Sequence, residues 1–557
     1  LAVRDGVVTD AASGRAARFG ELAEAAARQR MPADAPLKAP SDWRLVGTSP
    51  GRLDIPAKTN GSFAYGIDLV LPDMLYAAVR SAPVHGGRLV RADLAPAQGM
   101  PGVVKALRTE RAVAVVAESW WQAQQAVDAL EPEFDAGGAA VLDIGGLAAE
   151  QDRLLAASVG ESLDSEGDAD AALAAVPPER RVEAEYRVPY LHHAAMEPVN
   201  LTAQFEDGRL TVWGGEQDAL GAKARLVELS GLGSGAVTFH GLAAGGSFGR
   251  RIAPSADYME HVAPIARSVE PRPVKLILSR EEEFAQGSYR PALATRIRAA
   301  LSPDGRPHAW SQKYLAGPTR NEGFHVPYAI PNRSIRSVDF ATHVRTGTWR
   351  AVAHTQHAFW TESFIDELAH AAGRDPFEYR RDLLPEGSRE RRVLEAAAEL
   401  AGWATPPEAG RARGIAVAES YGTLVAEVVE ISMPDGAEAP RVHKVCAAVD
   451  CGTVVHPDTA RQQVEGAIVM GLSAALFEEI TLAGGAVAQA NFYDYRILTL
   501  AEAPEIEVRF LRSDAAWGGL GEPGLPPVAP ALANALFALT GRRVRSLPIA
   551  RALAETA

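Results

Sequence analysis

Short apolar runs typical of β-strands alternate with helical segments along most of this chain, and this alternation constrains the fold most strongly. Strand-like runs include MLYAAVRSA, RAVAVVA and VAEVVEISM, and helical runs include WWQAQQAVDAL and QQVEGAIVMGLSAALFEEI. With 557 residues, the chain is also too long for one hydrophobic core. The pattern therefore predicts an α+β protein of two to four packed domains.

Charge and hydropathy exclude two classes of partner. The formal net charge is -14, and no cluster of lysine and arginine stands out along the sequence. A nucleic-acid binder needs such clusters to neutralise phosphates, so we expect no nucleic-acid partner. The apolar runs are shorter than the roughly 20 residues that a membrane-spanning helix requires.

The chain has two cysteines, Cys446 and Cys451. This number excludes a disulfide framework, a cysteine-ligated iron–sulfur cluster and the usual structural zinc site, so any iron–sulfur centre must lie on another chain. No base can be assigned to Cys451, which favours a small buried side chain over a nucleophile. The sequence begins at Leu1 without a signal-like segment, and we expect that an upstream part is removed or separately encoded.

A glycine-rich segment, AGGSFGRR at residues 244–251, follows the strand-like run VTFHGLA. Its glycines allow positive φ angles and close approach of the backbone to a ligand, which suits an anion or a pterin. The segment matches neither a P-loop nor a dinucleotide fingerprint. Taken alone, a tight turn without a ligand is the more frequent case.

Two further residues are candidates for chemistry. Glu522 stands in GGLGEPGLPP, a rigid glycine and proline frame before a helix, where a desolvated carboxylate could act as a general base. The alternative is a solvated turn glutamate. Arg350, in TWRAVAH, could donate paired hydrogen bonds to an oxyanion or phosphate, although a surface arginine is more common.

Histidines occur in pairs at two places. His192 and His193 lie near Glu197, and His354 and His357 share a helical segment. Neither pair has a third ligand at suitable spacing, so packed histidines are favoured over a protein-ligated metal.

The order of these segments resembles the large subunit of the xanthine oxidase family of molybdenum hydroxylases. The matching segments include RLDIPAKTNG, HHAAMEPVNLTA, AGGSFGRR, TWRAVAHTQHAFW, VDCGTVVHPD and GGLGEPG, and they cover the chain from about Gly51 to Arg551. The GRR ending and the run VDCGTVVHPD are more similar to the branch of isoquinoline 1-oxidoreductases and bacterial aldehyde dehydrogenases than to xanthine dehydrogenase proper.

This resemblance implies a fold with a small hammerhead-like α+β domain and two large mixed α/β molybdopterin-binding domains. We expect a connector over residues 1–43, the hammerhead-like domain over 44–165, and the molybdopterin-binding domains over 166–385 and 386–557. The stretch from Phe134 to Arg180 has weak periodicity, and we expect it to wrap the surface between domains.

The resemblance also implies the roles of individual residues. Glu522 becomes the catalytic base, and the metal is held by the dithiolene of the pterin, without a protein ligand. The implied cofactor-binding residues are Gly245, Gly246, Ser247, Phe248, Gly249, Arg350, Ala351, Gln463 and Gly521. Two departures argue against purine substrates: Leu191 would replace a glutamine near the metal, and Val352 would replace a phenylalanine that stacks on the substrate.

The implied activity is hydroxylation of an aldehyde or N-heteroaromatic carbon with water as the oxygen source. Its cofactor would be a molybdopterin-type molybdenum cofactor, with the cytosine dinucleotide form as one option. Electrons would pass to a small [2Fe–2S] partner protein and then to an acceptor such as a cytochrome c.

The family's G-Q-G cofactor loop is missing between Asp382 and Arg411. An upstream or separate chain is therefore expected to supply it, making the enzyme a heteromer. The resemblance favours the periplasm, with the cytosol left open. A non-catalytic scaffold that keeps the fold without metal, and an unrelated glycine-rich hydrolase, are the alternatives; the hydrolase lacks a G-x-S-x-G motif.

Overall fold

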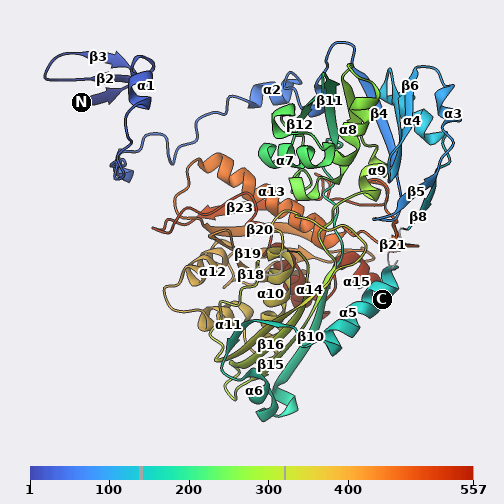
Figure 1. Cartoon of the computed structure of the whole chain (residues 1–557). Coiled ribbons are helices and arrows are strands. Elements are labelled where there is room, and N and C mark those ends of the chain that lie inside the picture. Colours follow the sequence, from blue (N-terminus) through green and yellow to red (C-terminus); the bar gives the residue numbers. More distant parts are fainter. Residues whose placement is uncertain (137–141, 319–321, 556–557) are drawn as a thin grey trace.

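A computed structural model describes residues 1–136, 142–318 and 322–555 of the chain. Its main body consists of three sheets stacked along one long axis, with helices packed on them (Figure 1). Mixed helix and strand content confirms the predicted α+β class. No described helix is long and apolar enough to cross a membrane.

A seven-stranded sheet forms the upper part of the molecule in Figure 1. In spatial order its strands are β13 (Val237–Gly241), β12 (Arg209–Gly214), β11 (Asn200–Glu206), β14 (Val274–Ile277), β4 (Leu75–Ser81), β7 (Ala112–Ala117) and β6 (Val103–Arg108). The helices of this part are α2 (Ile55–Asn60), α3 (Ala95–Gln98), α4 (Trp120–Asp128), α7 (Ala219–Ser230), α8 (Val262–Ser268) and α9 (Arg280–Ala285). Two separate apolar clusters cover its two faces.

A five-stranded sheet forms the opposite end (Figure 1). Its order is β10 (Arg181–Val188), β15 (Leu293–Leu301), β16 (Pro307–Ala316), β17 (Asn332–Asp339) and β9 (Glu161–Glu166). Helices α5 (Ile144–Ala157), α6 (Ala169–Ala175) and α10 (His354–Ala371) pack on it, and α11 (Pro376–Leu383) packs on α10.

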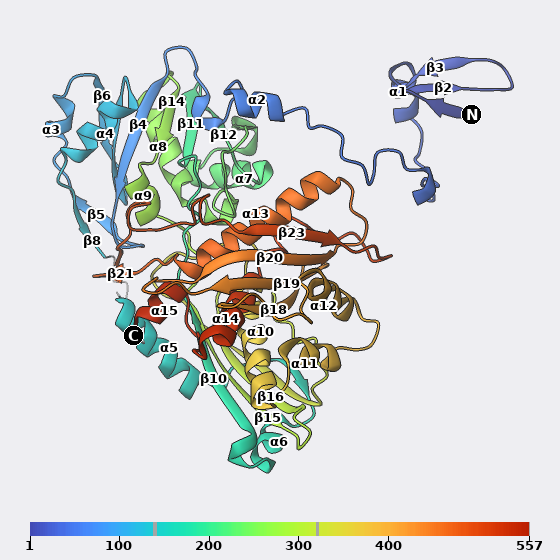
Figure 2. The same cartoon turned by 180° about the vertical axis from the view of Figure 1, so that it is seen from behind.

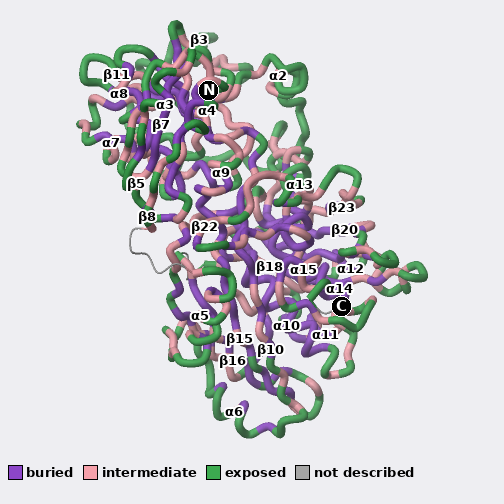
Figure 3. Tube along the Cα trace, turned by 90° about the vertical axis from the view of Figure 1, so that its right-hand side faces the viewer, coloured by how far each residue is buried: buried purple, intermediate pink, exposed green. Residues whose placement is uncertain are grey.

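A four-stranded sheet lies between these two ends. It comprises β18 (Arg411–Ser420), β19 (Thr423–Ser432), β20 (Arg441–Asp450) and β23 (Glu505–Phe510). Its helices are α12 (Arg389–Leu400), α13 (Pro457–Leu476), α14 (Val528–Thr540) and α15 (Ile549–Glu555). The central and five-stranded sheets share one apolar core, whereas the seven-stranded sheet has its own. In Figure 3, buried residues are concentrated along the strands of the sheets.

The remaining strands are short. Two ribbons, β5 (Arg88–Arg91) with β8 (Glu133–Asp135) and β21 (Leu482–Ala483) with β22 (Ala486–Val487), lie at the edges of the body. An N-terminal module contains β1 (Ala2–Arg4), β2 (Val7–Thr9), β3 (Ala16–Arg18) and α1 (Phe19–Ala27). Figures 1 and 2 show this module away from the body, at the end of an extended linker.

The domain boundary expected between residues 165 and 166 does not separate one sheet from another. Strands β4, β6 and β7, which precede that boundary, pair within the same sheet as β11 to β14. The stretch 134–180 also has more regular structure than its sequence indicated, since it contains α5, β9 and α6; its residues 137–141 lie outside the described ones. In α5, Leu147 and Leu155 reach the core from a helix that is otherwise rich in small and polar residues.

Candidate active site

A cavity of about 660 Å³ lies where loops of the upper part meet α13 and the segment before α14. Segments far apart in the sequence supply its walls. The lining residues are Gln217, Phe248, Gly249, Ile252, Thr348, Trp349, Arg350, Val352, Tyr421, Gln462, Gln463, Gly466, Gly521 and Glu522. The glycine segment, Arg350, Gln463 and Glu522, all selected from the sequence, therefore meet at one site.

The glycine loop, residues 244–251, has an unusual backbone. Gly246, Phe248 and Gly249 have φ angles of 109°, 58° and 111°. A Cβ on Gly249 would lie 2.2 Å from the carbonyl oxygen of Thr348, so this position accepts only glycine without rearrangement. Phe248 adopts a left-handed conformation that is costly for a residue with a side chain, and such strain concentrates at functional sites. The residue is 39% exposed and lines the cavity.

Two side chains outside the loop hold it in place. The Oε1 atom of Gln217 accepts hydrogen bonds from the Gly249 N–H at 2.9 Å and from the Ser247 hydroxyl. The buried Glu197 carboxylate accepts bonds from the backbone N–H groups of Gly245 and Ile67, the latter at 3.0 Å. Sequence reasoning missed the role of Gln217. Its position in the short segment between the strand that ends at Gly214 and the helix that begins at Ala219 was the available signal.

Arg250 and Arg251, at the C-terminal end of the loop, are buried and anchor it. Arg250 pairs with Asp257 at 2.9 Å and lies over the ring of Tyr258. Arg251 donates to the backbone oxygen of Glu197 at 3.0 Å and lies 3.4 Å from its carboxylate. Both guanidinium groups are almost fully buried, so they support the loop and do not face the cavity.

Arg350 connects three of the predicted segments. Its Nε donates to the carbonyl oxygen of Gly521 at 2.7 Å, and its Nη2 donates to that of Gln463 at 3.2 Å. Burial lowers the pKa of Arg350, while the nearby carboxylate of Glu522 opposes this effect. In the described chain, the guanidinium thus fixes the loop before α14 against α13.

Glu522 is half-buried at the cavity wall, and its Oε1 accepts a hydrogen bond from the Ala351 N–H at 2.8 Å. This N–H is presented by a strained turn, since Ala351 and Val352 have φ angles of 68° and 45°. Tyr421 lies across the same cavity, and burial together with the Glu522 charge raises its pKa well above the usual range. The carboxylate is therefore oriented by a backbone group and open to the cavity.

The predicted site residues divide into two groups. Phe248, Gly249, Arg350, Gln463, Gly521 and Glu522 line the cavity. Gly245, Gly246, Ser247 and Ala351 lie in the backbone immediately behind these residues, and Ala351 is fully buried.

The prediction that Leu191 takes the place of a glutamine at the cavity is wrong. Leu191 is fully buried in an apolar cluster with Trp349 and Leu525, and it is not a lining residue. Gln217, which precedes α7, Gln462 and Gln463 are the glutamines that line the cavity. Val352 does line the cavity, as expected. The argument against purine substrates therefore rests on Val352 alone.

Of the paired histidines, His192, His193 and His357 are packed in the interior, and His354 is half-buried. The Nε2 atom of His193 lies 2.7 Å from the carbonyl oxygen of Thr348, and because a carbonyl oxygen can only accept, the ring donates this hydrogen bond. Burial lowers the pKa of His193 and of His357 to about 3, so both rings are neutral at pH 7. Within the described residues, no three His, Cys, Asp or Glu side chains are grouped as a metal site.

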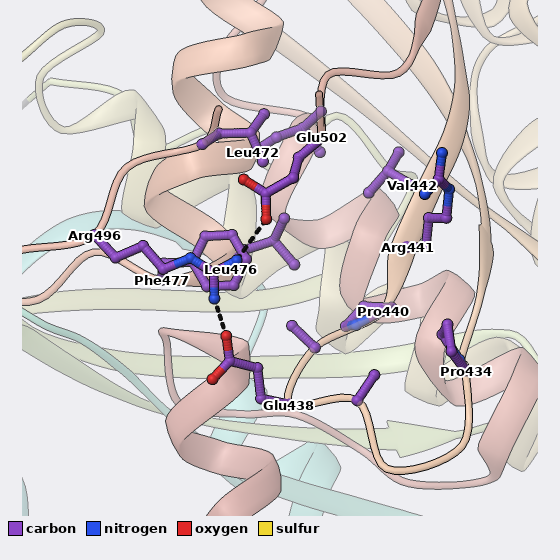
Figure 4. A pocket seen from close by; sticks show the side chains of 13 residues that line it. Pro434, Glu438, Pro440, Arg441, Val442, Leu472, Leu476, Phe477, Arg496 and Glu502 are labelled. Carbon is purple, nitrogen blue, oxygen red and sulfur yellow. Dashed lines mark hydrogen bonds and ion pairs between the residues drawn. The ribbon is translucent and has the colours of Figure 1, made fainter. Parts of the chain in front are cut away.

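A second cavity, of about 320 Å³, lies beside the C-terminal end of α13 (Figure 4). Arg496 lies over the ring of Phe477 and forms ion pairs with Glu438 and Glu502. None of the sequence-predicted site residues lines this cavity. Two carboxylates already neutralise Arg496, so the cavity around Glu522 remains the candidate active site.

Comparison with known proteins agrees with this arrangement. Two models of a molybdopterin cofactor-binding domain match residues 156–384 and 337–504. The beta chain of isoquinoline 1-oxidoreductase from Brevundimonas diminuta is 31% identical, over 93% of this chain and 70% of that protein. A nicotinate dehydrogenase component of Pseudomonas putida is also 31% identical, over 99% of this chain but only 50% of its own length.

A solved structure has the same fold. Quinoline 2-oxidoreductase from Pseudomonas putida 86 superposes with a TM-score of 0.78 at 16% identity, covering 92% of this chain and 98% of that one. The matched domains and this fold define a molybdopterin-binding protein. The chain belongs to the xanthine oxidase family of molybdenum enzymes, in which it is a molybdenum-binding oxidoreductase subunit.

Proposed function

We propose that this chain is the catalytic subunit of a molybdenum hydroxylase that oxidises an aldehyde or N-heteroaromatic carbon, with water as the source of oxygen. The observation that carries the proposal is Glu522, oriented by the Ala351 N–H at the wall of the 660 Å³ cavity. The names of the similar proteins, which include isoquinoline, nicotinate and aldehyde oxidoreductases, support this substrate class.

The residues around the cavity fit a pterin-bound metal. The loop at 244–251 brings its backbone to the cavity at Gly249, and because this residue has no side chain, a ligand can approach the main chain there. Gly245, Gly246, Ser247, Phe248 and Gly249 would hold the cofactor on one side, and Arg350, Ala351, Gln463 and Gly521 on the other. When bound, the cofactor supplies the two-electron redox chemistry that the side chains lack.

The protein residues position the substrate and move a proton. Oε1 of Glu522 is held by the Ala351 N–H, and Oε2 makes no hydrogen bond within the described residues. Oε2 is therefore the atom that accepts the proton when water is activated. Phe248, Ile252 and Val352 add apolar surface to the same cavity, which suits an aldehyde or a flat aromatic ring.

The proposal includes partner proteins that carry electrons away from this chain. Both cysteines are buried, and burial raises the pKa of Cys446 to about 11, which does not favour a thiolate ligand. Electrons would therefore leave through a [2Fe–2S] partner and then an acceptor such as a cytochrome c. The relatives are named as components of larger enzymes, in keeping with such an assembly. The cytosine dinucleotide form of the cofactor, a chain that supplies the G-Q-G loop, and a periplasmic location remain predictions from the resemblance.

The test is cofactor analysis of the native complex, combined with two matched variants. Molybdenum, iron and released pterin are measured in the wild type, in Glu522→Gln and in Glu465→Gln, which changes a half-buried glutamate of α13 outside the cavity. We expect all three proteins to retain molybdenum. Turnover of aldehydes and N-heteroaromatics should fall by about 10²- to 10⁴-fold in Glu522→Gln only.

Two outcomes would contradict the proposal. A native complex without molybdenum or pterin would favour the non-catalytic scaffold. Full turnover in a molybdenum-loaded Glu522→Gln variant would remove Glu522 as the base.

A further inference from the structure

A further cavity, of about 470 Å³, lies on the five-stranded sheet. It is polar and shares no lining residue with the candidate active site. Strands β15, β16 and β17 supply most of its basic side chains, and the C-terminal end of α5 borders it. The residues that line it are Leu155, Ala156, Val159, Asp170, Glu183, Arg296, Arg298, Ser311, Gln312, Lys313 and Arg336.

Three cations occupy one row across the sheet. Arg296 of β15 is directly opposite Lys313 of β16, and Lys313 is directly opposite Arg336 of β17. Like charges at directly opposed positions destabilise a sheet. The protein therefore keeps a costly arrangement at this position, and such local conflicts are typical of functional sites.

The positive charges of this row are only partly paired with carboxylates or other acceptors. Arg296 pairs with Glu185 at 2.5 Å and lies 3.8 Å from the Glu183 carboxylate. Lys313 donates to the Leu155 carbonyl oxygen at 3.1 Å, at the end of α5. The side chain of Arg336 has no hydrogen bond or ion pair within the part of the chain that the structure describes. The next row contains Arg298, which pairs with the exposed Asp170 at 3.3 Å.

The cations affect one another. The pKa of Lys313 is lowered, first by burial and then by the charges of Arg296, Arg298 and Arg336. Four cations thus line a cavity whose acidic lining residues are Asp170 and Glu183. An anion in the cavity would relieve the repulsion and satisfy the free donors of Arg336.

We propose that this cavity binds a small phosphate-class oxyanion, either free phosphate or the phosphate group of a small metabolite. Arg336 supplies a planar set of N–H donors, and Lys313 supplies a charge next to it on the neighbouring strand. Ser311 and Gln312 add neutral polar groups to the same cavity. This site is separate from the proposed catalytic function and does not depend on it.

The experiment measures binding to the native complex by calorimetry and by thermal shift, at constant ionic strength with chloride as the balancing ion. One arm uses inorganic phosphate and a second arm uses glycerol 3-phosphate. The variants are Arg336→Gln, Lys313→Gln and the control Arg306→Gln. Arg306 lies in the loop between β15 and β16, outside the cavity, and its loss removes the same charge from the same hairpin.

We expect saturable binding in at least one arm, and the tighter arm identifies the source of the phosphate group. Arg336→Gln and Lys313→Gln should weaken binding at least tenfold, whereas Arg306→Gln should not. In phosphate-free buffer of low ionic strength, Arg336→Gln should melt at a higher temperature than the wild type, because one repulsive cation is gone. Absence of binding in both arms, or equal weakening by Arg306→Gln, would overturn the proposal.

Discussion

At the scale of single residues, the candidate active site depends on backbone groups that particular side chains hold in position. The side chain of Gln217 accepts a hydrogen bond from the N–H of Gly249. The N–H of Ala351, in a strained turn, donates to the carboxylate of Glu522. Arg350 then joins Gly521 to Gln463. The geometry of the candidate site is thus set by contacts among the loops as much as by the side chain of Glu522.

Gly249→Ala should damage the glycine loop. Its Cβ would lie 2.2 Å from the Thr348 oxygen at a φ of 111°, a conformation that costs about 1–3 kcal/mol before the collision is counted. We expect a lower melting temperature and less bound molybdenum. Gly233→Ala is the control, because nothing lies within 4 Å of its Cβ and its φ is not positive. Equal molybdenum content in both variants would show that the loop tolerates a side chain.

Gln217→Ala should have a smaller effect of the same kind. The substitution removes the acceptor for the Gly249 N–H and the Ser247 hydroxyl, at a cost of about 1 kcal/mol where water can replace it. Urea unfolding and molybdenum content measure the change. Gln125→Ala, on the exposed side of α4, should alter stability by less than about 0.5 kcal/mol. If the two variants have the same stability, Gln217 does not hold the loop.

Local sequence was sufficient to mark the glycine loop, Arg350 and Glu522 as candidates, because glycine clusters and a carboxylate in a glycine and proline frame are visible locally. The family resemblance was needed to favour their functional roles and to add Gln463. Neither was sufficient to place Gln217 or to exclude Leu191. Both residues lie in ordinary strand-to-loop sequence, and only the packing shows that Leu191 points into the core while Gln217 reaches the cavity.

At the scale of elements, α13 and the residues after it connect the cavity to a buried polar network. Tyr495 lies 2.9 Å from Glu478, directly after α13, and 3.1 Å from the carbonyl oxygen of His192. The indole N–H of Trp349 donates to that same carbonyl at 3.2 Å, and Trp349 lines the cavity. Arg290 lies over the Trp349 ring. The wall beside Arg350 therefore rests on this network.

The pH dependence of stability should show the state of Glu478. Burial raises its pKa from 4.5 to about 7, while bonds from Ser473 and Tyr495 oppose the shift. The folded protein thus holds a proton that the unfolded chain releases near pH 4.5, and this stabilisation is lost as the pH rises through about 7. Relative to Glu478→Gln, the wild type should lose up to about 3 kcal/mol between pH 4.5 and pH 8.

Unfolding of both proteins at pH 5 and pH 8 gives the required comparison. Glu282→Gln offers a second case, because burial also raises the pKa of Glu282 to about 7. If the difference between the wild type and Glu478→Gln is the same at both pH values, the carboxyl group does not titrate in this range.

Regular elements with strong periodicity were predictable from the sequence. The helical pattern before Phe477 corresponds to α13, and the closing helical segment corresponds to α14. The stretch around α5 was not recognised, because Leu147 and Leu155 are its main core contacts among alanine, glycine and polar residues. Pairing of β4 with β14 also joins distant segments, which no local pattern can reveal.

At the scale of the whole molecule, the N-terminal module is the part least attached to the rest. No residue from 1 to 42 is buried, and both overall views show the module apart from the body. The chain joins the body at Trp43, which packs edge-on against Trp517, and at Gly47, whose N–H donates to the Val455 oxygen at 2.9 Å. The body's sheets and their cores are complete without the module.

Limited digestion of the native complex with trypsin tests this separation. Arg28, Arg30 and Lys38 lie in exposed chain between α1 and the contact at Trp43, so cleavage should occur there first. The remaining body should keep its melting temperature and its molybdenum, because no buried surface is lost with the module. A lower melting temperature after this cut, or first cleavage within the body, would mean that residues 1–42 pack against the body or a partner protein in the complex. Protection of all three sites would point to the same packing, since a covered linker cannot enter the protease.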